Sequence, residues 1–191
     1  MTDTTRATHR ATIAAFAAEA FKDHVLTTEG KGRWICRKPG TSAYAFCVIT
    51  APGAVIIFGD VGDAILMIDA LDPLPWLIGA TSVDYLLSKV QPEAMRRDRE
   101  FMPGDADAYL CEVETSDSRA VQGVRSLLAD LDLEGDRTEQ DRWLMACNEA
   151  GLDDPPRCDD FGSGLLWTYH AVRCFVRLYE AADAEKAKGK S

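Results

Sequence analysis

The stretch from residue 33 to residue 68 consists of short apolar runs separated by turn sequences, and this pattern constrains the fold most. Proline presets φ and glycine allows a positive φ, so the turns are expected at Pro39-Gly40, Ala51-Pro52-Gly53 and Gly59-Asp60-Val61-Gly62-Asp63. The apolar, β-branched run Ala54–Phe58 is typical of a buried strand. Short runs joined by tight turns predict an antiparallel meander of three or four strands.

Helical periodicity lies on both sides of this block. Apolar residues at helical spacing predict an N-terminal helix over residues 4–24, with one stripe of Ile13, Phe16, Ala17, Ala20 and Phe21. The turn-forming run 27–32 should end it. Capping and breaking residues predict further helices over 82–90, 93–101 and 105–114, then from 117, from 138 and from 164. The fold class is therefore α+β: an N-terminal helix, a small antiparallel sheet and a mostly helical C-terminal half.

The chain of 191 residues suits one domain with a real hydrophobic core, since 47% of its residues are hydrophobic. We expect a single α+β domain over residues 1–183, with the helix and sheet in 4–70 and the helical part in 72–183. Residues 184–191 are expected to form a charged, flexible tail.

The charge of the chain is unevenly distributed. The net charge is −10, and residues 97–160 alone carry 18 Asp and Glu against 7 Lys and Arg. Such a surface repels nucleic-acid phosphates and anionic lipid head groups, so neither nucleic acid nor a membrane is expected as a direct partner. It attracts basic partners, including proteins whose basic groove normally holds nucleic acid. Solubility alone is the competing explanation.

The six cysteines form no C-x-x-C pair and no zinc-binding spacing. The sequence shows no secretory signal and no apolar stretch of transmembrane length. We therefore expect a cytoplasmic protein of the bacterial host cell, with reduced thiols that act as small core residues.

The densest acidic group is the first candidate binding site, and it contains Asp105, Asp107, Glu112, Glu114 and Asp117. Acidic helices can imitate the phosphates of a duplex and fill a basic groove, provided that the charges share one face. Arginines such as Arg119 and Arg125 interrupt the array, so a solvated mixed surface remains the alternative interpretation.

A pair of carboxylates, Asp60 and Asp63, follows the apolar strand and is the second candidate site. Two carboxylates on a loop could bind a divalent metal or perform acid–base chemistry. A plain turn is the competing interpretation, because Gly-Asp pairs tolerate unusual φ values. No cofactor is predicted, and no Ser or Cys is placed beside His170 to form a nucleophile system.

One part of the chain resembles a family of uncharacterised bacteriophage and prophage proteins. The resemblance covers residues 30–90 and depends on Trp34-x-Cys36, Pro39-Gly40-Thr41-Ser42-x-Tyr44-x-Phe46, Ala51-Pro52-Gly53, Gly59-Asp60-Val61-Gly62-Asp63 and Asp84-Tyr85-Leu86-Leu87-Ser88-Lys89. It implies a phage or mobile-element origin and carries no catalytic residue with it. Small acidic accessory proteins of phages often bind a host protein, and anti-CRISPR inhibitors belong to this class.

These observations give three functional hypotheses. The leading one is a non-catalytic accessory protein that binds and inhibits a host protein or defence complex, such as a nucleic-acid-binding effector, in the manner of an anti-CRISPR. The second is a metal-dependent enzyme that uses Asp60 and Asp63. The third is a structural or regulatory phage protein that self-associates, and it keeps a homo-oligomer open.

Overall fold

The computed structural model of the protein describes residues 5–92, 98–114, 117–130, 139–152 and 154–188. Contacts between residues divide the chain into two compact units. Unit 1 consists of residues 1–9 and 100–160, and unit 2 consists of residues 10–99 and 161–191. Each unit has a hydrophobic core of its own. The single domain that we expected over residues 1–183 stays a prediction.

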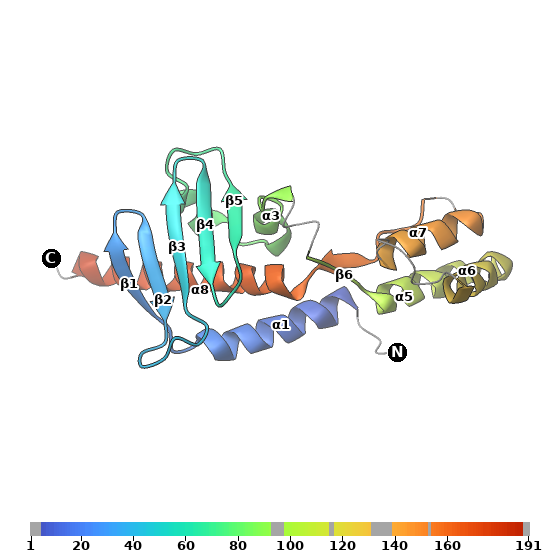
Figure 1. The fold of residues 1–191 in the computed structure, drawn as a ribbon, viewed down its shortest axis with the longest axis horizontal. Helices are drawn as coiled ribbons and strands as arrows, with labels where there is room; N and C mark the ends of the chain where they lie inside the picture. Colours follow the sequence, from blue (N-terminus) through green and yellow to red (C-terminus); the bar gives the residue numbers. More distant parts are fainter. Residues whose placement is uncertain (1–4, 93–97, 115–116, 131–138, 153, 189–191) are drawn as a thin grey trace. The chain divides into compact units, whose positions relative to one another are not determined.

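Unit 2 contains an antiparallel sheet of five strands, each paired with its neighbour in the sequence (Figure 1). The strands are β1 (Val25–Gly30), β2 (Arg33–Arg37), β3 (Phe46–Ala51), β4 (Ala54–Gly59) and β5 (Ala64–Met67). The predicted α+β class, with its N-terminal helix and helical C-terminal half, is confirmed. The sheet has more strands than the three or four that we expected. The extra strand is β1, most of which lies in the turn-forming run 27–32 that we expected to end the first helix.

The register of the sheet directs one set of side chains to the core. Trp34 pairs with Val48, Val48 with Ile57, and Val55 with Leu66. All of these side chains are buried in the main core. Alternate residues of a strand point to opposite faces, so these pairs define the inner face of the sheet. Tyr44 precedes β3, has φ = 59° and is 47% exposed, so the alternation ends before this residue.

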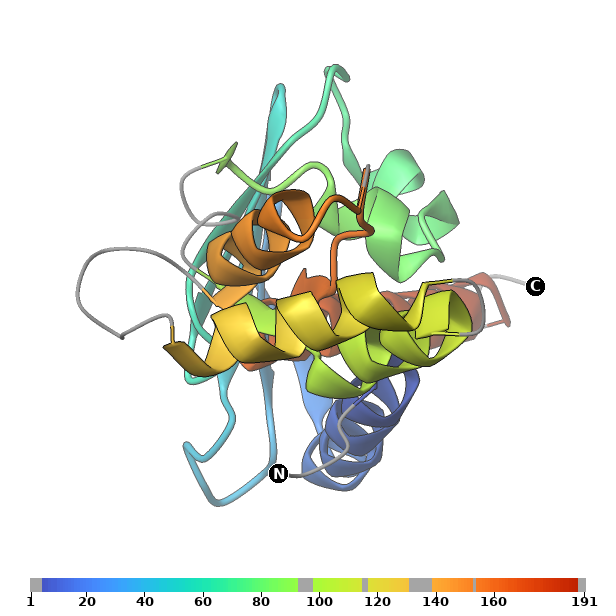
Figure 2. The ribbon, with the colours of Figure 1, turned by 90° about the vertical axis from the view of Figure 1, so that its right-hand side faces the viewer.

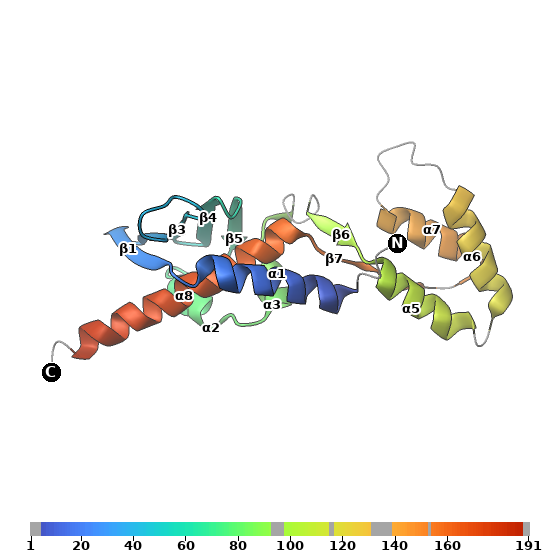
Figure 3. The ribbon, with the colours of Figure 1, turned by 90° about the horizontal axis from the view of Figure 1, so that it is seen from below.

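The helices of unit 2 lie on one side of the sheet (Figure 3). They are α1 (Arg6–Phe21, whose first four residues belong to unit 1), α2 (Leu74–Gly79), α3 (Val83–Leu87) and α8 (Ser163–Lys188). Aromatic contacts join α1 and α8 to the sheet: the ring centroids of Phe21 and Phe46 are 5.6 Å apart, and those of Trp34 and Phe175 are 5.3 Å apart. The predicted stripe on α1 was wrong for Phe16, which is 64% exposed.

Helix α8 begins at a carboxylate that precedes it by many residues. The backbone N–H of Leu165 donates to Oδ2 of Asp98, which satisfies one of the unpaired donors of the first helical turn. Gly162 and Gly164 make room for this carboxylate, since a Cβ at Gly164 would lie 2.9 Å from Oδ2, and one at Gly162 would overlap Oδ1. The Gly-Ser-Gly sequence is thus a helix start. The helix continues to Lys188, so residues 184–188 of the expected tail are helical.

Unit 1 is mainly helical, and its helices α5 (Pro103–Glu114), α6 (Ser118–Asp130) and α7 (Glu139–Glu149) lie side by side (Figure 2). Two short strands, β6 (Arg99–Phe101) and β7 (Asp159–Phe161), pair with each other, and their residues Arg99 and Phe161 belong to unit 2. The helix that we expected over 93–101 was therefore wrong for 99–101, where the backbone pairs with a strand distant in sequence; residues 93–97 lie outside the described chain. No described helix has both the length and the apolar character needed to cross a bilayer.

Candidate functional site

Trp143 organises the core of unit 1. Its side chain is fully buried, and its indole Nε1–H donates to the carbonyl oxygen of Pro156 at 3.0 Å. Its ring lies 6.0 Å from the ring of Tyr109 on α5 and 6.4 Å from that of Phe101. A buried indole needs such a hydrogen-bond partner, so Trp143 fixes α7 against α5 and against the chain that precedes β7.

A groove of about 180 Å³ opens beside Trp143, and we call it the acidic groove. Its apolar lining comes from three helices and the end of β6: Phe101, Pro103, Ala106, Leu110, Leu128 and Trp143. Charged side chains complete the lining: Asp107 on α5, and Glu139 and Arg142 on α7. Asp107 and Glu139 are exposed, while Arg142 is half-buried. The groove therefore combines an apolar floor with two solvent-accessible carboxylates.

This arrangement suits one kind of occupant. Its volume accommodates one or two side chains, and the apolar floor gains free energy when it covers aliphatic or aromatic surface. The two exposed carboxylates outnumber the half-buried Arg142 guanidinium, so the rim attracts a basic group and repels an acidic one. The acidic groove therefore fits an apolar side chain flanked by Lys or Arg on a partner protein.

The five acidic residues that the sequence singled out do not share one face. Asp105 and Glu112 are seven residues apart on α5 and lie on one side of it, whereas Asp107 and Glu114 lie on the opposite side. Asp105 pairs with Arg6 at 3.9 Å, and Glu114 pairs with Arg125 at 3.5 Å.

Asp117 has a structural role instead. Its Oδ1 accepts a hydrogen bond from the backbone N–H of Ala120 at 2.9 Å, so this carboxylate caps α6. Of the five residues, Asp107 is the one that lines the groove. Whether any of them contacts a partner stays a prediction.

Asp60 and Asp63 lie in the turn between β4 and β5, and both are exposed. Val61, which follows Asp60, is buried, and its carbonyl oxygen accepts from the Thr168 hydroxyl at 3.2 Å. That bond fixes the turn to α8. Among the described residues, no group of three or more His, Cys, Asp or Glu side chains could hold a metal ion. The geometry of this loop is that of an anchored turn with two solvated carboxylates.

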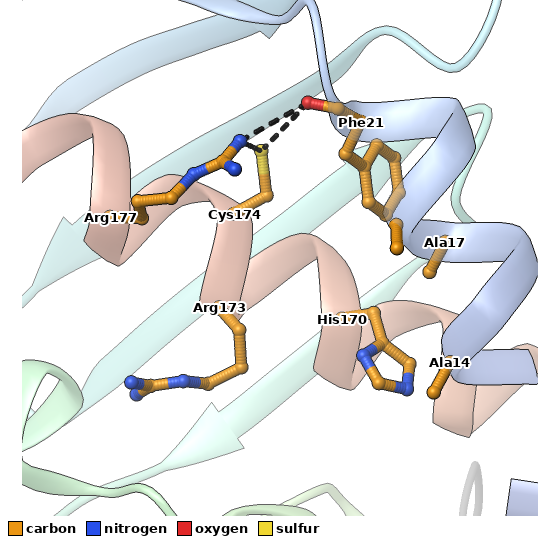
Figure 4. Close-up of a pocket in the computed structure, with 8 residues that line it drawn as sticks. Ala14, Ala17, Phe21, His170, Arg173, Cys174 and Arg177 are labelled. Carbon is orange, nitrogen blue, oxygen red and sulfur yellow. Dashed lines mark hydrogen bonds between the residues drawn. The ribbon is translucent and has the colours of Figure 1, made fainter. Parts of the chain in front are cut away.

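A second cleft, of about 210 Å³, lies between α1 and α8 (Figure 4). Its basic side chains serve the fold. Arg177 donates to the carbonyl oxygen of Phe21 at the end of α1, and Arg173 donates to that of Ala80 at the end of α2, both at 3.2 Å. Cations at helix C-termini satisfy unpaired carbonyls and complement the helix dipole. These contacts explain both arginines without a ligand.

Burial shifts the pKa values of the other titratable groups of this cleft. Burial lowers the pKa of His170, and it raises the pKa of the Cys174 thiol despite the nearby Arg177 guanidinium. Burial also raises the pKa of both Cys147 and Cys158 in unit 1 to about 11. Such thiols stay protonated near neutral pH and are poor nucleophiles. Cys111 differs from the other five cysteines because it is exposed.

The sequence pointed to Asp107 but not to Glu139, Arg142 or the apolar floor of the groove. Glu139 precedes Trp143 on α7 by four residues, and this helical spacing could have indicated a carboxylate beside a tryptophan. The contribution of Phe101 had no such signal, because it depends on β6 pairing with β7.

No protein-family model matches the chain, and no curated protein or solved structure shows significant similarity to it. The resemblance to phage proteins therefore stays a prediction, and the function has to be argued from the geometry.

Proposed function

We propose that the protein acts by binding another protein, and that the acidic groove of unit 1 receives a basic, apolar segment of that partner. The observation that carries this proposal is the combination, in one groove, of an apolar floor beside Trp143 with the carboxylates of Asp107 and Glu139. The surrounding sequence strengthens it, since residues 97–160 carry 18 acidic against 7 basic residues and would steer a basic partner toward the groove.

The partner class follows from the same chemistry. Proteins that bind nucleic acid present basic grooves in which arginine and lysine lie beside aromatic or aliphatic side chains. A host defence complex of this type, such as a CRISPR effector, offers the surface that the acidic groove would fit. In this proposal the protein is a phage or mobile-element accessory protein that blocks such a surface without catalysing a reaction.

The test uses the tagged full-length protein to capture purified nucleic-acid-binding effector complexes, with and without their nucleic acid. We expect the capture to weaken as salt rises and as nucleic acid is added, because both compete for the same basic surface. The double variant D107K/E139K should raise the dissociation constant about 10-fold or more, which corresponds to about 1.4 kcal/mol. Both side chains are exposed, so these changes leave the core of unit 1 intact.

The matched control is E149K, which changes the net charge by the same amount as D107K or E139K does alone, at an exposed position of α7 that does not line the groove. If E149K weakens capture as much as the groove variants do, binding reflects net charge and the groove is not its site. A failure of every effector complex to bind at low salt would refute the proposed partner class.

A further inference from the structure

The face of the five-stranded sheet that points away from the helices is apolar. The register sets Ile49, Ile56 and Ile65 in one row across three neighbouring strands. A second row consists of Ile35, Cys47 and Phe58. Met67, on β5, extends this surface and is 53% exposed. We call it the outer sheet face; its residues are Ile35, Cys47, Ile49, Ile56, Phe58, Ile65 and Met67.

This composition is unusual for a face without a cover. An antiparallel sheet that packs on one side usually alternates apolar residues inward with polar residues outward. Strands β3, β4 and β5 contain no charged residue at all. The run Ala54–Phe58 is typical of a strand buried on both faces, yet the helices of unit 2 cover one face only (Figure 3). The sequence of these strands thus indicates that a further protein surface packs on the outer sheet face.

We propose that the cover is a second copy of this chain, packed sheet against sheet on the outer sheet face. Five strands span about 24 Å, and their four to six residues each extend about 13–20 Å, which gives a flat area of roughly 400 Å². Side chains that stand up from a flat surface add accessible area to its projection. The face therefore approaches the roughly 800 Å² per partner that a stable interface buries. Two aligned sheets pack in this way in β-sandwiches, with their strands about 30° apart.

The charges of the face suit this partner. The outward residues of β2–β5 include no carboxylate, and Glu29 of β1 is paired with Arg33, so two copies of an acidic protein can approach here with little repulsion between carboxylates. The basic residues Arg33 and Arg37 lie on β2, beside the edge of the sheet, and Arg33 pairs with Glu29 at 3.3 Å. An apolar centre with charges at its rim is the usual layout of a protein interface.

The β5 edge of the sheet is closed to the addition of a strand. The segment that follows α3 closes β5: the N–H of Met67 donates to Lys89 at 2.7 Å, and the N–H of Gln91 donates to Ile65 at 3.0 Å. Backbone groups used in this way cannot pair with a further strand. This inference goes beyond the proposed function, because it concerns unit 2 and not the acidic groove.

Sedimentation equilibrium of the full chain, from low to high micromolar concentration, tests the proposal. We expect a reversible dimer of twice the 21.0 kDa chain mass. I56R, at the centre of the face, should raise the dimer dissociation constant about 30-fold or more, since a charge there is desolvated against an apolar surface. F58K and M67K, at positions 37% and 53% exposed, provide milder variants that keep the fold, and each should weaken the dimer.

Controls come from exposed apolar side chains elsewhere on unit 2: F16R on α1 and L71R after β5, at 64% and 88% exposure. Both should leave the dimer unchanged. A chain that stays monomeric at every concentration overturns the proposal and leaves the face to a partner of another kind. A dimer that F16R disrupts and I56R, F58K and M67K do not also overturns it. The effector-capture experiment can be repeated with a monomeric I56R variant. If that variant still captures the effector, binding at the acidic groove does not depend on the dimer, and the two proposals can fail independently.

Discussion

The carboxylate at the start of α8 allows a double-mutant cycle whose outcome the structure predicts in sign and size. The two perturbations are D98A, which removes the carboxylate, and G162A, which adds a methyl group where Oδ1 of Asp98 lies. Asp98 accepts from the N–H of Leu165, and this contact resembles a helix cap. Because Asp98 precedes α8 by more than sixty residues, the bond joins two distant parts of unit 2.

The magnitudes follow from these contacts. Loss of a capping carboxylate costs about 1 kcal/mol of unfolding free energy, and its loss from the positive end of the helix dipole adds about 0.5 kcal/mol. G162A should cost about 2 kcal/mol, because the methyl group displaces the carboxylate and strains its surroundings. In the double variant D98A/G162A the carboxylate with which the added methyl group would clash is absent. The loss of unfolding free energy should therefore be at least about 1 kcal/mol smaller than the sum of the losses in the two single variants.

The assay is urea unfolding of the four proteins, followed by far-ultraviolet circular dichroism, with G164A as a milder steric variant. The nearest atom to a Cβ at Gly164 is Oδ2 at 2.9 Å, so G164A should be destabilising by less than G162A. Strict additivity of D98A and G162A would refute the claim that the glycines exist to admit this carboxylate. So would a D98A variant as stable as the parent chain.

Two further predictions concern titration and metals. Burial lowers the pKa of His170, so the unfolded chain takes up a proton at a higher pH than the folded chain does, and stability falls as pH drops through the usual range of histidine. H170Q should therefore lose less stability than the parent between pH 7.5 and 5.5 in urea unfolding, and equal losses would contradict the burial argument. Mg²⁺, Mn²⁺ and Ca²⁺ should leave the melting temperature unchanged, because Asp60 and Asp63 are solvated turn residues; a shift that D60N abolishes would instead support the metal-enzyme hypothesis.

The elements that the sequence predicted well are those with a local signal. The cap of α3 is one example, since Ser82 accepts from the N–H of Tyr85 as its position before the helix predicts. The turns at Gly40 and Gly53 are others, because both glycines adopt the positive φ that a turn needs. In these cases the interactions that determine the structure involve residues within a few positions of one another.

The elements that the sequence did not predict depend on distant partners. Strand β1 is polar and exposed, and it exists because Leu26 and Thr27 pair with Cys36 and Ile35 of β2. Strands β6 and β7 are three residues each and have no periodicity to detect. Phe16 shares the helical spacing of the buried residues on α1 but lies outside the face that packs.

The candidate site shows the same division. Charge counting located the acidic segment and included Asp107, whereas helical geometry placed Asp105 and Glu112 on another side of α5. The groove itself needs α7 and the end of β6 to lie against α5, and Trp143 provides that contact. A composition cannot show which carboxylates border an apolar floor.

Hydrogen–deuterium exchange, with and without a captured effector, tests most directly whether the acidic groove is the binding surface. We predict slower exchange in the amides of residues 104–110 and 139–143 when the partner binds, and loss of that protection in D107K/E139K. Unchanged exchange in both segments, with protection elsewhere in the chain, would contradict the account and place the binding surface outside the groove.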